Sequence, residues 1–569
     1  MLSWPSFLRE RNLVKKTEGK RFGFLFPSSY DVGMSGMTTL VITHLVSQVP
    51  TWRAERFFTP WNPFVEAVSL ESGATLRDVD VIGFTTQFEQ HYLMAGWLIQ
   101  KAGIPLDNRK RKRQINNWPL IVVGGPCCMA NPLPLIDMVD GYFLGDVEES
   151  LPLFLHLLDE YGVEGFRRNP FDFADVKGFW SPHFLDVNNT LYSSLFNDRC
   201  FEEMVGGWFE RFQFIELNEA PYPLQQIVTE LPDYHPYAPV KGRTFQLEIG
   251  RGCNHKCRFC MISRLLHKGR YRDYETLREL VFEGTKLSGV TKVDIFGTNL
   301  SDYPLKPFTD LCWEIVNNGL QLSVATFRPD RISAELMDVL VEGGQPSVTI
   351  APECGSDRLR GLVGKRITNE QITEATHTVF AAGITALKDF FVVGLPGETE
   401  EDRDAIVQLV EQQLKIAKGY DQGNYLKVDV NPVVPKWHTP LKNWLYYYLE
   451  DHRPELRAIL IRLYCELSRL GDVRPKETAL LEYLAQTWLT HLTSPVNPLI
   501  EGMTLDSHVP ISRNLGYYLL STHAAEINAD LNAVWDGFVR DGWSITHPLR
   551  ASPYSDETLT REWRALIGA

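Results

Sequence analysis

The sequence lacks the features of a membrane-spanning or secreted protein. No apolar run approaches the roughly 18 uninterrupted residues of a membrane span, and the first twenty residues contain no apolar core of a signal peptide. The nine cysteines are an odd count without the regular spacing of a disulfide framework. There is no internal repeat and no low-complexity tract. These absences predict a reduced, cytoplasmic protein.

Clustered positive charge is also scarce. The chain has 57 basic and 71 acidic residues and a formal net charge of −14. Nucleic-acid binding requires Lys and Arg gathered on one surface, so the composition argues against a nucleic-acid partner. The single basic run, residues 109–113, is interpreted as a solvated loop.

What is present is an ordinary globular composition, 44% hydrophobic and 22% charged over 569 residues. At about 150 residues per domain, this length predicts three or four domains. Residues 1–165 alternate strands and helices, with apolar strands at 21–26, 81–84 and 120–123, which predicts a doubly wound, Rossmann-like domain. Ligands of such sheets gather at the carboxyl ends of the strands.

The alternation weakens over residues 166–240, which are interpreted as a linker, and resumes over 241–440. Six strands are predicted there, at 245–249, 292–296, 322–325, 347–350, 386–393 and 426–430, separated by helices. This pattern indicates a partial (β/α)6 barrel. Beyond residue 441 the strand signal fades, and 457–470 and 480–492 have helical periodicity. A mainly helical C-terminal domain over 441–569 is therefore expected.

Three of the cysteines lie within eight residues, directly after the first predicted barrel strand: Cys253, Cys257 and Cys260. Spacings of four and three allow three thiolates to bind one [4Fe–4S] cluster from a single loop, and three ligands leave one iron open. Flanking cations, Arg251, Lys256 and Arg258, are expected to favour thiolates over thiols. A zinc site is the alternative, but zinc usually requires a second Cys or His pair.

The C-x-x-x-C-x-x-C loop, with Phe259 inside it and a partial barrel behind it, resembles the radical S-adenosylmethionine (radical SAM) superfamily. The resemblance implies that the open iron chelates SAM and that electron transfer cleaves SAM to a 5′-deoxyadenosyl radical. It also implies an electron donor such as flavodoxin or ferredoxin, and a small-molecule or peptide substrate.

Further loops of the barrel are similar to SAM-binding segments of this superfamily. Gly297 and Thr298 stand where the family usually has a Gly-Gly-Glu-like turn for the methionyl amine, and the acidic residue is missing here. Glu353, in Ala-Pro-Glu-Cys-Gly-Ser, resembles a ribose contact, and Gly394 opens a Gly-rich turn near the adenine. Arg328 and Lys388 are candidates for the methionine carboxylate or are barrel-mouth ion pairs.

The first domain resembles the cobalamin-binding-like domain fused to one group of radical SAM proteins, the uncharacterised YgiQ-like group. The similar stretches are 27–35, 84–89, 123–126 and 144–149. This resemblance implies that cobalamin is bound by the strand-end loops that contain Tyr30, Gly33, Thr85, Gln87, Gly124 and Gly125. The domain lacks the Asp-x-His-x-x-Gly signature, so bound cobalamin would have no protein histidine below cobalt.

The resemblance therefore implies a cobalamin-dependent radical SAM methyltransferase that methylates an unreactive carbon. The alternative is a radical SAM enzyme for cyclisation, C–C coupling or rearrangement, in which the first domain is only a scaffold. Methylthiotransfer is disfavoured because Cys127, Cys128 and Cys200 do not form a convincing second cluster site. A non-enzymatic iron–sulfur sensor is disfavoured because it has no need of the SAM-like loops.

Overall fold

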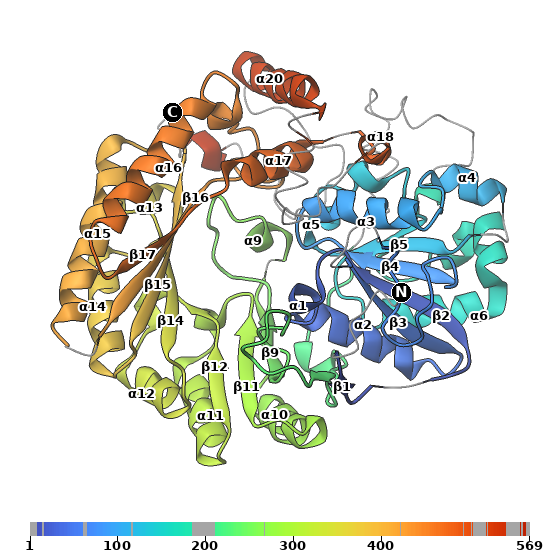
Figure 1. Ribbon diagram of the computed structural model, residues 1–569, viewed down its shortest axis with the longest axis horizontal. Coiled ribbons are helices and arrows are strands. Elements are labelled where there is room, and N and C mark those ends of the chain that lie inside the picture. The colour runs from blue at the N-terminus through green and yellow to red at the C-terminus, as the bar shows by residue number, and fades with distance from the viewer. Residues whose placement is uncertain are drawn as a thin grey trace.

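Two α/β units lie side by side in the computed structural model of the protein, and C-terminal helices extend across one end of both (Figure 1). The structure describes residues 8–13, 16–60, 65–114, 118–184, 211–266, 268–420, 423–492, 494–501, 503, 519, 522–541, 558 and 561–564. Cys200 lies outside these residues. None of the helices described is long and apolar enough to cross a membrane.

The first unit is a six-stranded sheet in the order β3-β2-β4-β5-β6-β7. Its strands are β2 (Lys20–Phe26), β3 (Trp52–Phe58), β4 (Val81–Thr85), β5 (Leu120–Gly124), β6 (Gly141–Phe143) and β7 (Phe179–Trp180). All pairs are parallel except β6–β7. The doubly wound fold expected for this part is confirmed, and β7 extends the sheet beyond the predicted boundary at residue 165.

Helices cover both faces of this sheet because its strands are apolar on both sides. The helices are α1 (Tyr30–Gly33), α2 (Met37–Gln48), α3 (Gln90–Lys101), α4 (Asn108–Arg113), α5 (Pro126–Ala130) and α6 (Ser150–Arg168). The basic run forms α4, where Arg111 is fully buried against Asp140 at 3.0 Å. This part of the run is therefore not the solvated loop expected from the sequence.

The second unit is the predicted partial barrel. Its parallel strands are β9 (Phe245–Arg251), β11 (Lys292–Gly297), β12 (Gln321–Val324) with β13 (Thr326–Phe327), β14 (Ser347–Glu353), β15 (Ala386–Val393) and β16 (Tyr425–Pro432). The helices that cover its outer face are α10 (Tyr274–Ser288), α11 (Leu305–Asn317), α12 (Ala334–Glu342), α14 (Asn369–Ala381) and α15 (Glu400–Lys418).

Burial alternates along the later barrel strands. In β15, the residues that pack under the helices are buried, whereas Lys388, Phe390 and Val392 on the inner face are only half-buried. The inner face of β14 shows the same partial exposure. The inner face of these two strands is therefore partly accessible to solvent.

The C-terminal region contributes both helices and a strand. Helices α16 (Arg453–Ser468) and α17 (Leu480–His491) match the predicted helical segments, and α20 (Ala524–Asp541) follows. Between α16 and α17, β17 (Val473–Lys476) pairs in parallel with β16 and adds a strand that the sequence did not predict. One continuous apolar cluster includes residues of both units and of α16, α17 and α20, so the parts of the chain share a core.

Candidate cofactor site

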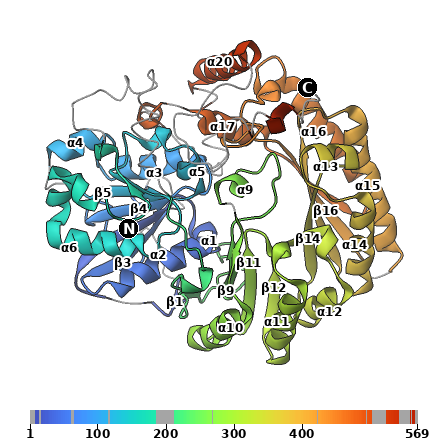
Figure 2. The ribbon, with the colours of Figure 1, turned by 180° about the vertical axis from the view of Figure 1, so that it is seen from behind.

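The loop with the three cysteines starts where β9 ends, at the mouth of the barrel. Gly252 has φ +78°, and a Cβ there would lie 2.1 Å from the Leu266 carbonyl oxygen. Only glycine therefore allows the chain to turn back at this point. The short helix α9 (Ile262–Leu265) closes the loop, and it lies between the two units in both views (Figure 1, Figure 2).

The structure brings Cys253, Cys257 and Cys260 together and leaves each of them partly exposed. The Cys260 amide donates to the Cys257 carbonyl at 3.1 Å, and Asn299 Nδ2 donates to Cys253 Sγ at 3.5 Å. Within the described ranges, no three His, Cys, Asp or Glu side chains converge on a single metal ion. A [4Fe–4S] cluster would bind each of the three thiolates at a separate iron.

Thr298 connects the second barrel strand to the cysteine loop. Its hydroxyl accepts from the Gly252 amide at 3.2 Å, and its own amide donates to the Gly250 carbonyl at 3.3 Å. A Cβ at Gly297 would lie 3.0 Å from the same carbonyl oxygen. These two predicted SAM-site residues therefore lie at the loop and hold it in place.

An ion pair lies beside the second cysteine. Lys365 Nζ is 2.8 Å from Glu353 Oε1, and both side chains are largely buried. Glu353 has φ +65°, a left-handed conformation that costs about 1–3 kcal/mol for a non-glycine residue and is concentrated at functional sites. The predicted ribose contact is thus held by a cation and a strained backbone next to Cys257.

Burial has a larger effect on the pKa of the Cys253 and Cys257 thiols than the flanking cations have. It raises the pKa of Cys253 and raises the pKa of Cys257 to about 12, and Lys365 opposes the second shift. Of the flanking cations, Arg251 binds carboxylates and Arg258 donates to the Leu362 carbonyl. The expectation that these cations favour the thiolates was therefore wrong for Cys253 and Cys257. Metal coordination itself deprotonates such thiols.

Both candidates for the methionine carboxylate are engaged in ion pairs. Arg328 binds Asp330 through two contacts of 3.0 Å. Lys388 lies 2.9 Å from Asp429 on the next strand and stacks over Phe390 at 4.5 Å. In this structure, both residues therefore form ion pairs, the alternative role that the sequence suggested for them.

An apolar cluster includes residues of the loops after β14 and β15. It consists of Cys354, Leu359, Val363, Leu395, Val433, Leu441 and Trp563, with Phe259, Leu362, Val392 and Trp444 packed against it. Gly394 has φ +82°, and its carbonyl accepts from Trp444 Nε1 at 2.7 Å. Phe259 and the Gly394 turn, both predicted SAM-site features, therefore meet at one apolar wall.

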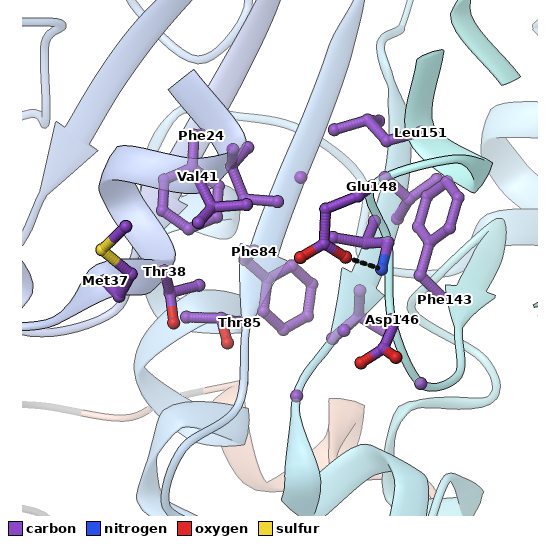
Figure 3. Close-up of a pocket in the computed structure, with 18 of the residues that line it drawn as sticks. Phe24, Met37, Thr38, Val41, Phe84, Thr85, Phe143, Asp146, Glu148 and Leu151 are labelled. Carbon is purple, nitrogen blue, oxygen red and sulfur yellow. Dashed lines mark hydrogen bonds between the residues drawn. The ribbon is translucent and has the colours of Figure 1, made fainter. Parts of the chain in front are cut away.

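A second site lies at the carboxyl edge of the first sheet, where a cavity of about 250 Å³ opens (Figure 3). Its inner part is apolar, with Phe24, Val41, Phe84, Phe143 and Leu151 around it. Its rim is polar and includes Thr38 and Thr85. An apolar cavity with a few polar groups at strand ends is the usual form of a small-molecule site.

Four of the six residues predicted to bind cobalamin line this cavity: Thr85, Gln87, Gly124 and Gly125. The other two do not line it. Tyr30 is fully buried, and its hydroxyl donates to Glu10 at 2.8 Å. A Cβ at Gly33 would lie 2.4 Å from the Phe58 ring, so this glycine is required by packing between α1 and β3.

One wall of the cavity is charged and comes from both units. Asp146 and Glu148, on the loop after β6, bind Arg251 at 3.0 and 2.5 Å. Arg251 also binds Glu248 at 2.9 Å, and Arg270 binds Asp146 at 2.6 Å. All but Arg270 line the cavity. The ion pairs of Arg251, two residues before the first cysteine, thus connect the cavity to the cysteine loop.

Sequence reasoning missed this charged wall. From the sequence, the stretch 144–149 stands out only by its similarity to a family, and Arg251 only as a cation beside the cysteines. Their positions in the sequence could have indicated such a site. Asp146 and Glu148 follow a strand of the first sheet, and Glu248 and Arg251 lie at the end of the first barrel strand. The pairing itself joins residues about one hundred positions apart.

Comparison with known families agrees with this architecture. Residues 37–182 match the family described as "Radical SAM proteins, N-terminal", and residues 247–410 match "Radical SAM superfamily". An uncharacterized protein of Methanocaldococcus jannaschii, MJ0966, is 27% identical over 74% of this chain and 78% of its own length. An uncharacterized methyltransferase of Pyrococcus horikoshii, PH0819, is 29% identical over 34% of this chain and 44% of its own.

Two solved structures share the fold. The methyltransferase TsrM from Kitasatospora setae, with cobalamin and a [4Fe–4S] cluster bound, aligns with a TM-score of 0.52 at 12% identity, over 87% of this chain and 99% of its own. The cobalamin-dependent radical enzyme OxsB aligns with a TM-score of 0.52 at 13% identity, over 97% and 79%.

These matches establish that the chain belongs to the radical SAM superfamily. It is a radical SAM enzyme, and its two α/β units have the fold of TsrM and OxsB.

Proposed function

We propose that the protein is a cobalamin-dependent radical SAM methyltransferase that methylates an unreactive carbon. In this proposal the three loop cysteines bind the [4Fe–4S] cluster, and the first unit binds cobalamin. The observation that carries the proposal is the cavity at the carboxyl edge of the first sheet, because one of its walls is built by the barrel strand that leads into the cysteine loop.

The size of the cavity indicates which part of cobalamin it would hold. At about 250 Å³, it is smaller than the roughly 300–1,000 Å³ of sites that enclose a drug-sized ligand. Its apolar inner part suits the flat base of the nucleotide tail, and the polar rim suits the tail's hydroxyl and phosphate groups. The corrin ring would then lie outside the cavity, at the mouth that faces the barrel.

The cavity-lining glycines have different roles. A Cβ at Gly125 would lie 2.8 Å from the Thr86 amide nitrogen, so glycine is needed there for the fold itself. A Cβ at Gly124 would be 3.6 Å or more from its neighbours, which is ordinary van der Waals contact. The absence of a side chain at Gly124 therefore has no packing reason and is explained by space kept for a ligand.

When bound, the cluster and SAM supply radical chemistry, and cobalamin supplies a carrier for a methyl group. The protein's own residues would hold these groups in place. Thr298 and Asn299 fix the cysteine loop, and Lys365 neutralises Glu353 beside Cys257 until SAM arrives. The half-exposed inner face of the barrel, with Phe390 and Val392, leaves space for a substrate next to the loop.

The test is equilibrium binding of hydroxocobalamin to the anaerobic protein. Gly124→Leu should abolish binding, because the larger side chain starts at a cavity-lining position, and Gly124→Ala should reduce it less. The iron–sulfur absorption should be the same in both variants. Absence of binding to the unaltered protein at high micromolar cobalamin would overturn the proposal and favour the scaffold alternative.

A second measurement addresses methyl transfer without knowledge of the substrate. With reduced cobalamin present, the protein should convert SAM to S-adenosylhomocysteine, and Gly124→Leu should not. Bound cob(II)alamin should give a paramagnetic resonance spectrum without a protein histidine ligand, because the first domain lacks the Asp-x-His-x-x-Gly signature. Cobalamin binding without formation of S-adenosylhomocysteine would contradict the methyltransferase proposal.

A further inference from the structure

The last described residues of the chain, 561–564, lie against the cysteine loop. Glu562 binds Arg264 of α9 through two contacts, at 2.6 and 3.2 Å. Arg264 is fully buried, and it also donates to the Lys256 carbonyl inside the cysteine loop at 3.1 Å. This contact spans 298 positions of sequence. It anchors the end of the chain to the helix that closes the cysteine loop.

The next residue, Trp563, packs into the apolar wall described above. It is only 5% exposed and belongs to the same cluster as Leu395 and Val433. Its ring centroid is 6.0 Å from that of Trp444, whose indole nitrogen donates to Gly394. Phe259, from the cysteine loop, packs against this cluster. Trp563 therefore lies in the same apolar wall as Phe259 and the Gly394 turn.

The residues around Trp563 come from several parts of the barrel. The wall comes from the cysteine loop and from the segments that follow β14, β15 and β16. In both ribbon views, the dark red C-terminal turn lies between α16 and α17 (Figure 1, Figure 2). A buried tryptophan contributes a large apolar surface and a rigid ring, which suits contact with a flat heterocycle or with the residues that hold one.

We propose that residues 561–564 complete the SAM site: Glu562 anchors the segment to α9, and Trp563 closes the apolar wall against which the adenosyl group binds. Trp563 is a positioning residue, and it acts through Phe259, Leu395 and Trp444. The proposal rests on the radical SAM assignment and not on cobalamin, so its test remains valid if the first unit binds no cobalamin.

The first experiment measures SAM affinity in the cobalamin-free protein with its cluster reconstituted. Trp563→Ala should weaken SAM binding about 2- to 13-fold, because an aromatic contact contributes about 0.5–1.5 kcal/mol. Trp563→Phe should restore most of the affinity. Glu562→Gln should weaken binding in the same direction, since it removes the charge that pairs with buried Arg264.

The matched control for the charge change is Glu526→Gln. Glu526 also forms a C-terminal ion pair, with His523 at 2.6 Å, but it is 64% exposed. Its substitution should leave SAM affinity unchanged. Iron and sulfide content should match the unaltered protein in every variant, because none of these residues is a cluster ligand.

The second experiment is hydrogen exchange of the C-terminal peptide with and without SAM. SAM should slow exchange of residues 561–564, because binding and ordering of the wall are linked. SAM affinity that is unchanged in Trp563→Ala, or exchange that is unchanged by SAM, would overturn the proposal. Loss of the cluster in both Trp563→Ala and Trp563→Phe would also overturn it, because the segment would then hold the cysteine loop and not SAM.

Discussion

Replacement of Arg251 by methionine tests how the two α/β units are held together. Methionine keeps much of the side-chain volume but removes the charge, and it leaves Asp146, Glu148 and Glu248 without the cation that lies 2.5–3.0 Å from them. The three carboxylates are at most 13% exposed. Removing one partner of such a buried pair costs about 3–5 kcal/mol.

The assay is thermal unfolding of the anaerobic protein. For a domain of 150–250 residues, 1 kcal/mol shifts Tm by about 2–4 °C, so the first transition of Arg251→Met should fall by roughly 10 °C. Lys177→Met is the control. It breaks an ion pair of the neighbouring loop, with Glu149 at 3.3 Å, but both side chains are about half exposed and little change is expected.

The interface also predicts how the Tm difference changes with pH. Burial raises the pKa of Asp146, but Arg251 and Arg270 outweigh that effect and the net pKa is lowered. Such a carboxylate stabilises the fold above its unfolded pKa, and this stability is lost as pH falls through the folded pKa. The Tm difference between the unaltered protein and Arg251→Met should therefore be kept from pH 7 to about pH 4 and shrink as the pH falls further. A difference that is below about 2 °C at pH 7, or that grows on acidification, would refute this account of the interface.

The remaining predictions concern the cluster, SAM and the barrel. Replacing the three loop cysteines together with alanine should abolish the ~400 nm iron–sulfur absorption, and a full cluster in that variant would remove the cluster assignment. With dithionite and SAM, the reconstituted protein should release 5′-deoxyadenosine, measured by chromatography. Glu353→Ala should weaken SAM binding by about 1–3 kcal/mol in equilibrium titrations, and unchanged affinity would exclude Glu353 from the site. Burial raises the pKa of Asp389 to about 7, and Gln413 opposes the shift. Between about pH 4 and pH 7 the unfolded chain therefore ionises at Asp389 while the folded protein keeps the proton, and the stability of the fold falls as the pH rises. Asp389→Asn, which can donate to the unpaired Gln413 Oε1, should raise the denaturation midpoint at pH 8 and change it little at pH 4, and an equal effect at both values would contradict that pKa.

Strands defined by local patterns could be predicted from the sequence. The prediction for residues 120–123 lies within β5, because an uninterrupted apolar run before a turn signal identifies a buried parallel strand. In contrast, β3 was missed, because Trp-Arg-Ala-Glu-Arg-Phe-Phe contains charges in its middle. Arg56 of this strand is nevertheless fully buried, between Glu10 at 2.6 Å and Glu71 at 2.6 Å. These partners come from distant segments, and no local pattern reveals them.

The same limit applies to the site. The three cysteines of the motif lie within eight residues, so the sequence alone was enough to predict the cluster loop. Tyr30 and Gly33 follow a strand of the first sheet, as ligand-binding residues do, yet they serve the packing of α1 on β3. The opposite case is Arg251, which sequence reasoning assigned to the thiolates and which the structure pairs with carboxylates. The direction of the Arg251 side chain depends on carboxylates of the other unit, which a local sequence pattern does not reveal.

The extra strand β17 has a consequence for how the protein can be divided. A boundary at residue 440, natural from the sequence, separates β16 from the strand that pairs with four of its residues, Leu426 to Asp429. A shortened chain that ends there would expose the unpaired amides and carbonyls of β16, and an open strand edge is a template for aggregation. The truncated barrel should therefore precipitate on expression, whereas a chain that ends after α17 should keep its last strand covered.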